Sequence, residues 1–397
     1  MSAVAAAVRA PVRARLLEPE HGPLPLFLND RERGALLREI EASGLRGRGG
    51  AGFPTAVKLA AVAKVGKAVV VANGTEGEPA SWKDKVLLAS NPSLVIDGAL
   101  VAAELVRARE VIFTVGRAHG EVRRRLERAL GEHEGDVEVY LESVPDRFVA
   151  GQDTALVSWL DGNEAKPTIR RPHERGLLVQ NVETLANLGL IARYGARWFR
   201  EAGTEDEPGT VLVTVHGAVR QPGVVEVELG TPIRDVLHRF GGLTALPQAL
   251  LVGGYFGTWV RAHDALDLPL SNAALAPLGA SLGARTIVVL PQDACGLAES
   301  VRVARYLAHE SAGQCGPCVF GLPAVADALE RLDVDRVRRL VPQVSGRGAC
   351  AHPTGAARFV ASAVEVFSDE IERHRSGRCC GRTHLPVLPV GAATEWR

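Results

Sequence analysis

The chain has 397 residues, of which 46% are hydrophobic, and it carries 46 basic and 46 acidic side chains. This length allows two or three domains with apolar cores, and the balanced charge argues against a general nucleic-acid binder or a membrane-surface protein. Apolar runs are short and interrupted by charge, so we expect no membrane-embedded segment, and without a secretory signal we expect a cytoplasmic protein.

The first 29 residues are expected to form a disordered tail. Residues 1–17 are rich in Ala and Arg and lack acidic side chains. This composition weakly resembles a transit peptide, but nothing after it predicts a packed element before about residue 30. We therefore begin the first domain at residue 30.

The first candidate site is the glycine loop, residues 44–58, with the sequence GLRGRGGAGFPTAVK. Glycine is costly to order, so a run of glycines indicates a backbone with positive φ or one that a ligand approaches closely. The loop leads into a helix near Pro54, where free N–H groups and the helix dipole favour an anion. Positive charge is added by Arg46, Arg48 and Lys58. We predict a phosphate site, with a flexible arginine–glycine linker as the alternative.

Residues 30–204 alternate between strand and helix patterns. Strands are predicted at 67–72, 111–115 and 137–141, with helices at 94–106 and 121–130. This alternation predicts a parallel sheet with helices on its faces, which binds ligands beyond the carboxyl ends of its strands. The polar loop NGTEGEPASWKDK, residues 73–85, follows the first strand and is a second candidate site; a polar surface turn is the alternative.

An acidic stretch with Gly and Pro, residues 203–209, indicates a domain boundary. The following region, residues 205–290, reads as two strands (211–215 and 224–228), a helix (233–240) and a strand (250–252). This order predicts a small α+β module of β-grasp type, and the module contains no evident catalytic cluster.

Residues 291–375 are predicted to be a helical bundle. Helices are expected at 301–307, 322–332 and 334–340, and one apolar stripe runs from 356 to 371 as a single last helix. Residues 376–397 are expected to be a C-terminal tail.

All six cysteines follow residue 290. Cys315 and Cys318 form a C-x2-C pair before a helix, and Cys350 precedes the last helix. Thiolates at helix N-termini have lowered pKa values and bind metals readily, and disulfides are rare in the cytoplasm. The residues alone leave several interpretations open: a metal centre such as zinc, a redox pair, or unligated thiols.

Together these motifs resemble the NADH-oxidising flavoprotein subunit of respiratory complex I and related hydrogenase and formate dehydrogenase subunits. The resemblance runs from about Leu36 to His374. GLRGRGGAGFPT resembles the flavin loop of that family, and NGTEGEPASWKD and VQNVETLANLGLI resemble its second and third site loops. GPCVFG and GACAHPTGAARFVASAVEVFSDEIE resemble its iron–sulfur region. The resemblance implies an α/β fold: a Rossmann-like FMN-binding domain, a β-grasp (soluble-ligand-binding) module and a helical bundle that binds a [4Fe–4S] cluster.

The resemblance also assigns roles to individual residues. Those implied to bind FMN are Gly47, Arg48, Gly49, Gly50, Lys58, Asn73, Glu76, Asn181 and Thr184, with Lys58 on the phosphate. Those implied to bind the nicotinamide nucleotide are Phe53, Glu78 and Asp153, with the Phe53 ring stacking and the Glu78 carboxylate accepting ribose hydroxyls. The implied cluster ligands are Cys315, Cys318 and Cys350.

Several residues depart from the family pattern. Thr75 replaces an aspartate, Gln152-Asp153 replaces paired glutamates, and His173 replaces a phenylalanine. The changes at Gln152 and His173 predict weak use of NADH. Ala312 stands where the first cluster cysteine is expected, so the cluster lacks one thiolate. The candidate replacement ligands are His352, Cys379 and Cys380, although the Ser-Gly break before the last two is more typical of free surface thiols. Cys295 is interpreted as a buried thiol.

The leading hypothesis is electron transfer from NADH through FMN and the iron–sulfur cluster to a partner redox protein or ferredoxin-type subunit. Two alternatives remain. One is a non-catalytic relative that binds flavin or a partner. The other is a structural zinc protein that uses Cys315, Cys318 and Cys350.

Overall fold

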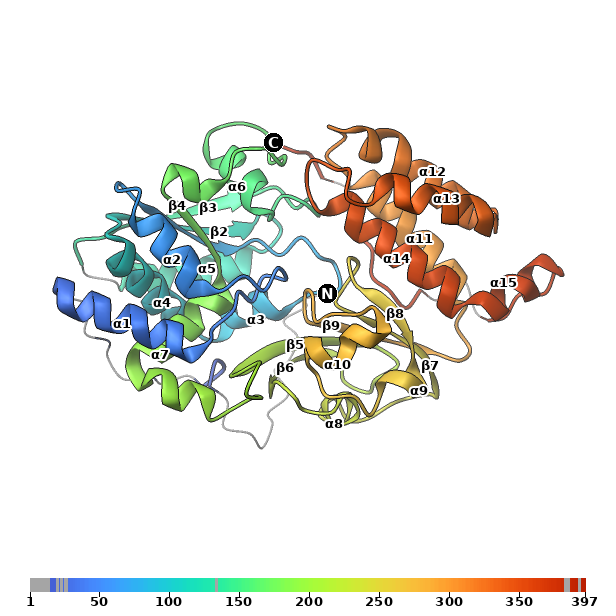
Figure 1. The fold of residues 1–397 in the computed structure, drawn as a ribbon, viewed down its shortest axis with the longest axis horizontal. Helices are drawn as coiled ribbons and strands as arrows, with labels where there is room; N and C mark the ends of the chain where they lie inside the picture. Colours follow the sequence, from blue (N-terminus) through green and yellow to red (C-terminus); the bar gives the residue numbers. More distant parts are fainter. Residues whose placement is uncertain are drawn as a thin grey trace.

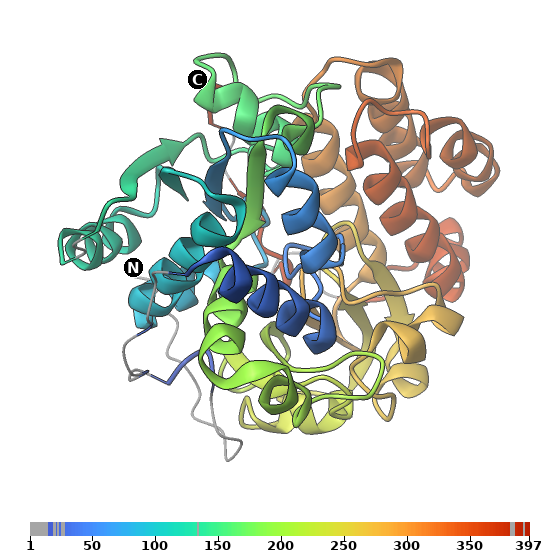
Figure 2. The ribbon, with the colours of Figure 1, turned by 60° about the vertical axis from the view of Figure 1, so that its left-hand side comes forward.

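The computed structural model describes residues 15–18, 21, 24, 28–132, 135–381, 386–391 and 394–397. The chain is arranged in three parts: an α/β part, a second sheet and a helical region (Figure 1). Figure 2 shows the same three parts from another side, again with the red helices on one side and the yellow strands beneath. The predicted fold class is confirmed.

Within the described residues, the first sheet has four parallel strands in the order β3-β2-β1-β4. They are β1 (Val69–Gly74), β2 (Glu110–Gly116), β3 (Glu138–Val144) and β4 (Leu177–Asn181). The sequence analysis missed β4. This edge strand has only five residues and runs directly into a helix, so it carries little pattern of its own.

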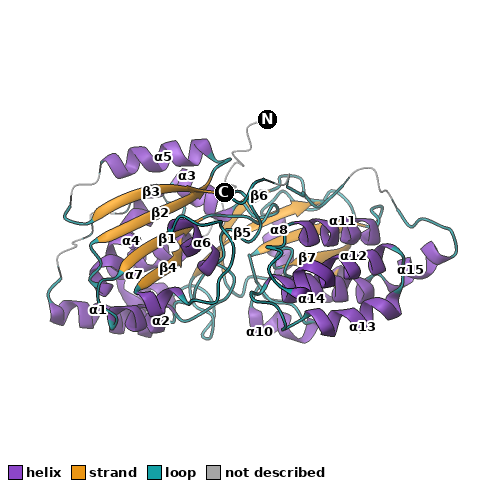
Figure 3. Cartoon of the chain, turned by 90° about the horizontal axis from the view of Figure 1, so that it is seen from above, coloured by secondary structure: helices purple, strands orange, loops and turns teal. Residues whose placement is uncertain are grey.

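Helices cover both faces of this sheet (Figure 3). One face packs against α2 (Thr55–Ala63), α4 (Pro92–Val106) and α7 (Val182–Arg200), and α1 (Asp30–Ser43) packs on the outside of α7 and α2. The other face packs against α6 (Asp153–Leu160). α4 and α7 approach so closely that a Cβ on Gly98 would lie 1.8 Å from the carbonyl oxygen of Leu185. The remaining helices of this part are α3 (Lys83–Ser90) and α5 (Gly120–Gly131).

The second sheet has the strand order β6-β5-β9-β7-β8 within the described residues. Its strands are β5 (Thr210–Gly217), β6 (Gly223–Glu228), β7 (Pro247–Val252), β8 (Thr258–Arg261) and β9 (Thr286–Pro291), accompanied by the short helices α8 (Ile233–His238), α9 (Ala262–Ala265) and α10 (Asn272–Leu275). The predicted order of two strands, helix and strand is correct. The central strand β9 was missed because all six of its residues are buried, and a short continuous apolar run does not distinguish a strand from a helix.

The helical region contains α11 (Gly296–His309), α12 (Leu322–Glu330), α13 (Val334–Val344), α14 (His352–Val366) and α15 (Ser368–Arg375). The expectation of one continuous last helix is wrong, because the chain breaks at Phe367 (φ −100°, ψ 25°). The buried Phe367 ring packs 5.2 Å from the Trp259 ring and also faces Gly296. The apolar stripe therefore continues across a bend in the backbone.

The described parts of both expected tails pack against the body of the protein. Near the start, the backbone N–H groups of Arg15 and Leu16 donate to Glu226 at 2.9 Å. Near the end, the N–H of Leu388 donates to Glu299 at 2.9 Å, and the Arg147 guanidinium lies 4.2 Å from the centre of the Trp396 ring. Most of residues 1–29 lie outside the described residues.

In the described part of the chain, no single helix is both long and apolar enough to span a bilayer. The bent pair α3 and α4, which meet at 98°, satisfies the length and composition test only when taken together.

Candidate functional site

A cavity of about 550 Å³ lies where the three parts of the chain meet. It opens beyond the carboxyl ends of β1 and β4, the edge at which a parallel sheet binds ligands. Residues of the second sheet's turns, among them Gly253 and Phe256, form another wall, and Cys350 and His352 contribute from the start of α14. The sequence analysis gave the β-grasp module no part in the site. The only available signal was the glycine pair that follows β7.

The cavity collects most of the predicted flavin and nucleotide residues. It is lined by Gly47, Gly49, Gly50, Phe53, Lys58, Asn73, Glu76, Glu78, Asp153, Asn181 and Thr184. Arg48 does not line it. The Arg48 guanidinium is buried and donates to the carbonyl of Pro208 at 3.2 Å, while its backbone N–H donates to Thr184 at 2.8 Å. Arg48 therefore stabilises the position of the glycine loop without lining the cavity.

The glycine loop fits a group that approaches the backbone closely. Gly50 has φ +108°, which side-chain-bearing residues rarely adopt, and a Cβ on Gly49 would lie 3.2 Å from Asn181 Cβ. Beside the loop, Lys58 Nζ donates to the Val179 carbonyl at 2.6 Å and to Asp153 at 3.2 Å. Because an ammonium group has three donors, one N–H of Lys58 remains for an anion in the cavity.

Asn73 and Glu76 are held in place by their own neighbours. Asn73 Nδ2 donates to the Gly151 carbonyl at 2.8 Å, and a Cβ on Gly151 would lie 2.5 Å from the Thr75 carbonyl. Glu76 accepts from the Ser81 hydroxyl and from the backbone N–H of Asp84. These contacts close the polar loop 73–85 on itself and present it to the cavity.

A buried group of charges at the wall of the cavity was not predicted as a unit. Lys83 Nζ lies 2.6 Å from Asp84 and 2.9 Å from Glu183. Asp84 in turn accepts from Asn181 Nδ2 at 2.7 Å. Burial raises the pKa of Asp84 to about 6, although the Lys83 ammonium works in the opposite direction. These charges fix the Asn181 amide. The signal in the sequence was the Lys-Asp-Lys run at the end of the polar loop.

The predicted nucleotide side contains a carboxylate with spare bonding capacity. Glu78 Oε2 accepts from the backbone N–H of Tyr255 at 3.0 Å, whereas Oε1 is buried without a partner among the described residues. Burial raises the pKa of Glu78 to about 8. Phe53 is 52% exposed at the cavity. An unpaired carboxylate oxygen beside an exposed ring fits a sugar hydroxyl and a flat base.

Two residues that depart from the family pattern, Gln152 and His173, lie in different positions relative to the cavity. Gln152 lines the cavity and caps α6, because its Oε1 accepts from the N–H groups of Thr154 and Ala155 at 3.0 and 3.1 Å. His173 lies in the turn 172–175 and is not among the residues that line the cavity. The sequence interpretation that His173 alters the nucleotide site therefore has no support in this geometry.

The cluster thiols, defined as Cys315, Cys318 and Cys350, gather beside the cavity. Burial opposes ionisation of Cys315, but backbone hydrogen bonds from Ala349 and Cys318 outweigh it and lower the pKa of Cys315. Burial, with the Cys315 thiol as neighbour, raises the pKa of Cys318 to about 12. Cys350 lines the cavity itself. Three thiols in this position fit an iron–sulfur cluster, and the buried Ala312 supplies no fourth ligand.

The proposed replacement ligands are not equivalent. His352 is buried beside the cavity, with Nε2 2.7 Å from the Leu307 carbonyl and Nδ1 without a partner among the described residues. Cys379 and Cys380 lie near Cys295, which begins α11, whereas Cys315 follows the other end of that helix. A 14-residue helix is roughly 20 Å long, so of the three candidates Cys379 and Cys380 lie too far from the cluster thiols to complete the cluster.

Three family models match successive parts of the chain. Residues 40–189 match the Nuo51 FMN-binding domain, residues 212–254 the SLBB domain, and residues 299–374 the iron–sulfur binding region of NADH-ubiquinone oxidoreductase-F. The FMN-binding match contains the glycine loop and the polar loop 73–85, and the iron–sulfur match contains all three cluster thiols.

Curated relatives match over most of their length. The F subunit of the NADH-quinone oxidoreductase of Streptomyces coelicolor is 31% identical over 376 residues, which covers 87% of this chain and 84% of the relative. This chain belongs to the family of NADH-quinone oxidoreductase F subunits. The F subunit of the Aquifex aeolicus enzyme is 30% identical, with 85% of each chain covered. These matches confirm the resemblance inferred from the motifs.

A solved structure agrees with this family assignment. A chain in the crystal structure of an NAD⁺-reducing [NiFe]-hydrogenase in the H₂-reduced state superposes with a TM-score of 0.80 at 28% identity. The match covers 89% of this chain and 69% of that chain. The matches to the FMN-binding domain and to the iron–sulfur binding region give FMN and an iron–sulfur cluster as the cofactors of this chain.

Proposed function

We propose that this chain is an NADH-oxidising electron-transfer subunit. Bound FMN supplies the chemistry that converts a two-electron hydride transfer into single-electron steps, and the iron–sulfur cluster carries those electrons onward. The observation that supports the proposal best is the single cavity, which joins the glycine loop, the unpaired oxygen of Glu78 and the thiol of Cys350.

The chain's own residues would divide the cavity into two ends. Lys58 and the N–H groups around Gly49 and Gly50 would hold the FMN phosphate, because they form the cationic, side-chain-free part of the wall. Asn73, Glu76, Asn181 and Thr184 would position the rest of the cofactor through hydrogen bonds. Arg48 would act on the loop rather than on the flavin.

The other end would hold the nucleotide. Glu78 would accept a ribose hydroxyl on Oε1, Phe53 would stack on a ring, and Asp153 would orient Lys58 as well as face the substrate. Gln152 is neutral and its amide oxygen already caps α6, so it does not supply the negative charge that the family pattern has at this position. We therefore propose that NADH binds more weakly than the family pattern implies.

The electron exit would lie at the cluster thiols. Cys350 lines the cavity, so the cluster would begin where the flavin site ends. The partner is proposed to be a redox protein or a ferredoxin-type subunit, and the cytoplasmic location expected from the sequence belongs to this proposal.

Flavin binding is tested by Gly50→Val. A Cβ at φ +108° would strain the loop and occupy the backbone face that receives the phosphate, so retained flavin should fall to near zero. The matched control is Gly66→Val, because Gly66 also has positive φ (+71°) but its Cβ would meet nothing within 4 Å. Flavin stoichiometry is measured by absorption. Stoichiometric flavin in Gly50→Val would overturn the assignment of the loop.

Electron transfer is tested by stopped-flow reduction of the anaerobic protein with NADH. We expect saturable flavin bleaching, with a raised dissociation constant in Glu78→Gln and an unchanged one in Glu201→Gln, the control, because Glu201 is exposed and outside the cavity. Improved affinity in Gln152→Glu would support the account of weak binding. Flavin that NADH does not reduce would favour the non-catalytic alternative, and zinc at the cluster thiols would favour the structural one.

A further inference from the structure

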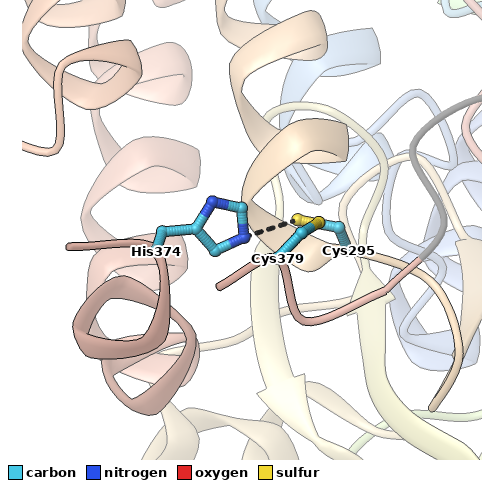
Figure 4. A group of neighbouring side chains, drawn as sticks. All are labelled: Cys295, His374 and Cys379. Atoms are coloured by element: carbon cyan, nitrogen blue, oxygen red, sulfur yellow. Dashed lines mark hydrogen bonds between the residues drawn. The ribbon is translucent and has the colours of Figure 1, made fainter. Parts of the chain in front are cut away.

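A second group of metal-binding side chains lies away from the cavity, at the start of α11. This tail cysteine group consists of Cys295, His374, Cys379 and Cys380. Cys295 is fully buried at the N-cap of α11, His374 lies near the end of α15, and the two adjacent cysteines follow that helix. Figure 4 shows His374 and Cys379 turned toward Cys295 from their separate segments.

The donor atoms of the tail cysteine group are close enough to share one ion. His374 Nε2 lies 3.4 Å from Cys295 Sγ and 3.3 Å from Cys380 Sγ. The sulfur atoms of Cys379 and Cys380 each lie within 4.8 Å of Cys295 Sγ. In a tetrahedral zinc site with bonds of about 2.3 Å to sulfur and 2.0 Å to nitrogen, the ligand atoms are roughly 3.5 Å apart. Cys379 and Cys380 belong to two separate groups of close donor atoms that share Cys295, so binding of one ion by all four residues would draw these two sulfur atoms together.

We propose that Cys295, His374, Cys379 and Cys380 bind one structural zinc ion. Three thiolates and one imidazole form a closed nitrogen and sulfur set, which is typical of structural zinc and leaves no position for a substrate. On binding, the three thiols release their protons to solvent, and no electron is transferred. The site is separate from the cluster thiols, because α11 stands between Cys295 and Cys315.

Glu370 supports the site without completing it. Its Oε2 accepts from the Cys380 thiol at 3.0 Å and from the backbone N–H of Gly296 at 3.0 Å. The Cys380 thiol loses its proton when it binds zinc, so its hydrogen bond to Glu370 positions Cys380 only in the metal-free protein. The carboxylate itself stays bonded to the first turn of α11. The fourth ligand is then the imidazole of His374.

The backbone around the site shows that the tail is fitted to this position. A Cβ on Gly381 would lie 2.7 Å from the carbonyl carbon of Ala294 and 2.8 Å from the carbonyl oxygen of Asp293. Glycine therefore lets the tail cross directly over the residues that precede Cys295. Farther along, Leu388 is buried and hydrogen-bonded to Glu299. The zinc ion would fix the start of this packed tail to α11.

The test is metal analysis of the full chain, purified without oxygen from cells supplied with zinc and iron. We expect one zinc per chain in the wild type and in a Cys315→Ser, Cys318→Ser, Cys350→Ser variant that has lost its iron. His374→Ala should lower zinc affinity at least tenfold. The matched control is His263→Ala, because His263 is an exposed histidine outside the site.

A second measurement avoids dependence on the folding of a variant. Metal-free protein titrated with Co²⁺ should develop the visible and thiolate charge-transfer bands of a tetrahedral site, and added zinc should remove them. The inference is overturned if the wild type holds no zinc, if zinc disappears with the cluster thiols, or if His374→Ala leaves its affinity unchanged. It is also overturned if intact-mass analysis finds Cys295 in a disulfide with Cys379 or Cys380, because these residues are free thiols in the structure. Zinc that disappears with the cluster thiols would also favour the structural zinc alternative, whereas the other results do not depend on flavin or NADH and leave the proposed function unchanged.

Discussion

The cluster thiols and the tail cysteine group contain the same number of thiols but differ in shape and surroundings. The cluster thiols border a cavity, and the position that would supply a fourth thiolate is occupied by Ala312. The tail cysteine group is compact, adds an imidazole and lies against the buried first turn of α11. An iron–sulfur cluster places each thiolate on its own iron, whereas a single ion draws all ligands together. The cavity beside one group and the imidazole in the other, rather than the cysteine count, distinguish the two groups.

The largest effect that would test this difference is expected for Cys318→Ser. Of the cluster thiols, Cys318 is the most buried, and its loss would leave only two thiolates for the cluster. We expect nearly complete loss of iron with zinc unchanged, measured by metal analysis and EPR of anaerobic protein. Cys295→Ser is the reciprocal control and should lose zinc while it keeps iron. Loss of both metals in either variant would mean that the groups are not independent.

A smaller effect is expected for Gly381→Val. The added side chain cannot fit against the Asp293–Ala294 backbone, so Cys379 and Cys380 would be displaced while every ligand remains present. Zinc affinity, measured by competition with a chelator, should fall roughly 10- to 100-fold, as for other changes to supporting residues. Gly131→Val is the control, because a Cβ there meets nothing within 4 Å. Unchanged affinity would show that the tail does not need this contact.

Ala312→Cys should make the cluster thiols more like a complete set. The alanine is buried near Cys315, so the substitution adds one sulfur at the position where the family has its first cluster cysteine. We expect a severalfold longer half-life of the cluster in air, followed by its visible absorption, with no change in zinc content. Ala308→Cys, four residues earlier near the end of α11, is the control. An unaltered half-life would indicate that another group, such as His352, already serves as the fourth ligand.

The smallest expected effect concerns the change of folding stability at low pH. It comes from His216, which belongs neither to the cluster thiols nor to the tail cysteine group. Burial lowers the pKa of His216 from 6.5 to about 4, so its ring is neutral in the folded protein but binds a proton on unfolding. Stability from this residue is therefore complete above pH 6.5 and is lost as the pH falls toward 4, by about 1 kcal/mol at pH 5.5. His216→Leu should flatten this part of the stability curve, measured by urea unfolding. The same variant can be tested for retention of iron and zinc at pH 5.5. If the wild type loses metal at this pH and His216→Leu does not, the wild-type loss would result from unfolding rather than from protonation of the metal ligands.

The sequence predicted the parts of the site that depend on local chemistry. The glycine loop and the polar loop 73–85 could be identified because glycine content and strand-end polarity are local properties. The parts that depend on distant contacts were not accessible. Arg48 reads as a phosphate ligand beside Lys58, yet its guanidinium bonds to Pro208. Only the fold reveals that partner.

The helical region shows the same limit. Its helices followed from apolar periodicity, but the bend at Phe367 depends on the ring of Trp259 in another part of the chain. Cys379 and Cys380 followed a Ser-Gly break and looked like free surface thiols. Their position beside Cys295 depends on the return path of the tail over α11, for which no local residue pattern gives a signal.

The contact between Arg147 and the end of the tail has a consequence for the folding rate. Arg147 donates to the Thr394 carbonyl across 247 positions of sequence, while the Arg147 carbonyl forms the wall against which Gly77 packs. Closing so long a loop is entropically slow, and contacts of this range form late. The back of the cavity should therefore become rigid last. Flavin added during refolding is expected to be captured in a slow final phase, after most helical structure has returned.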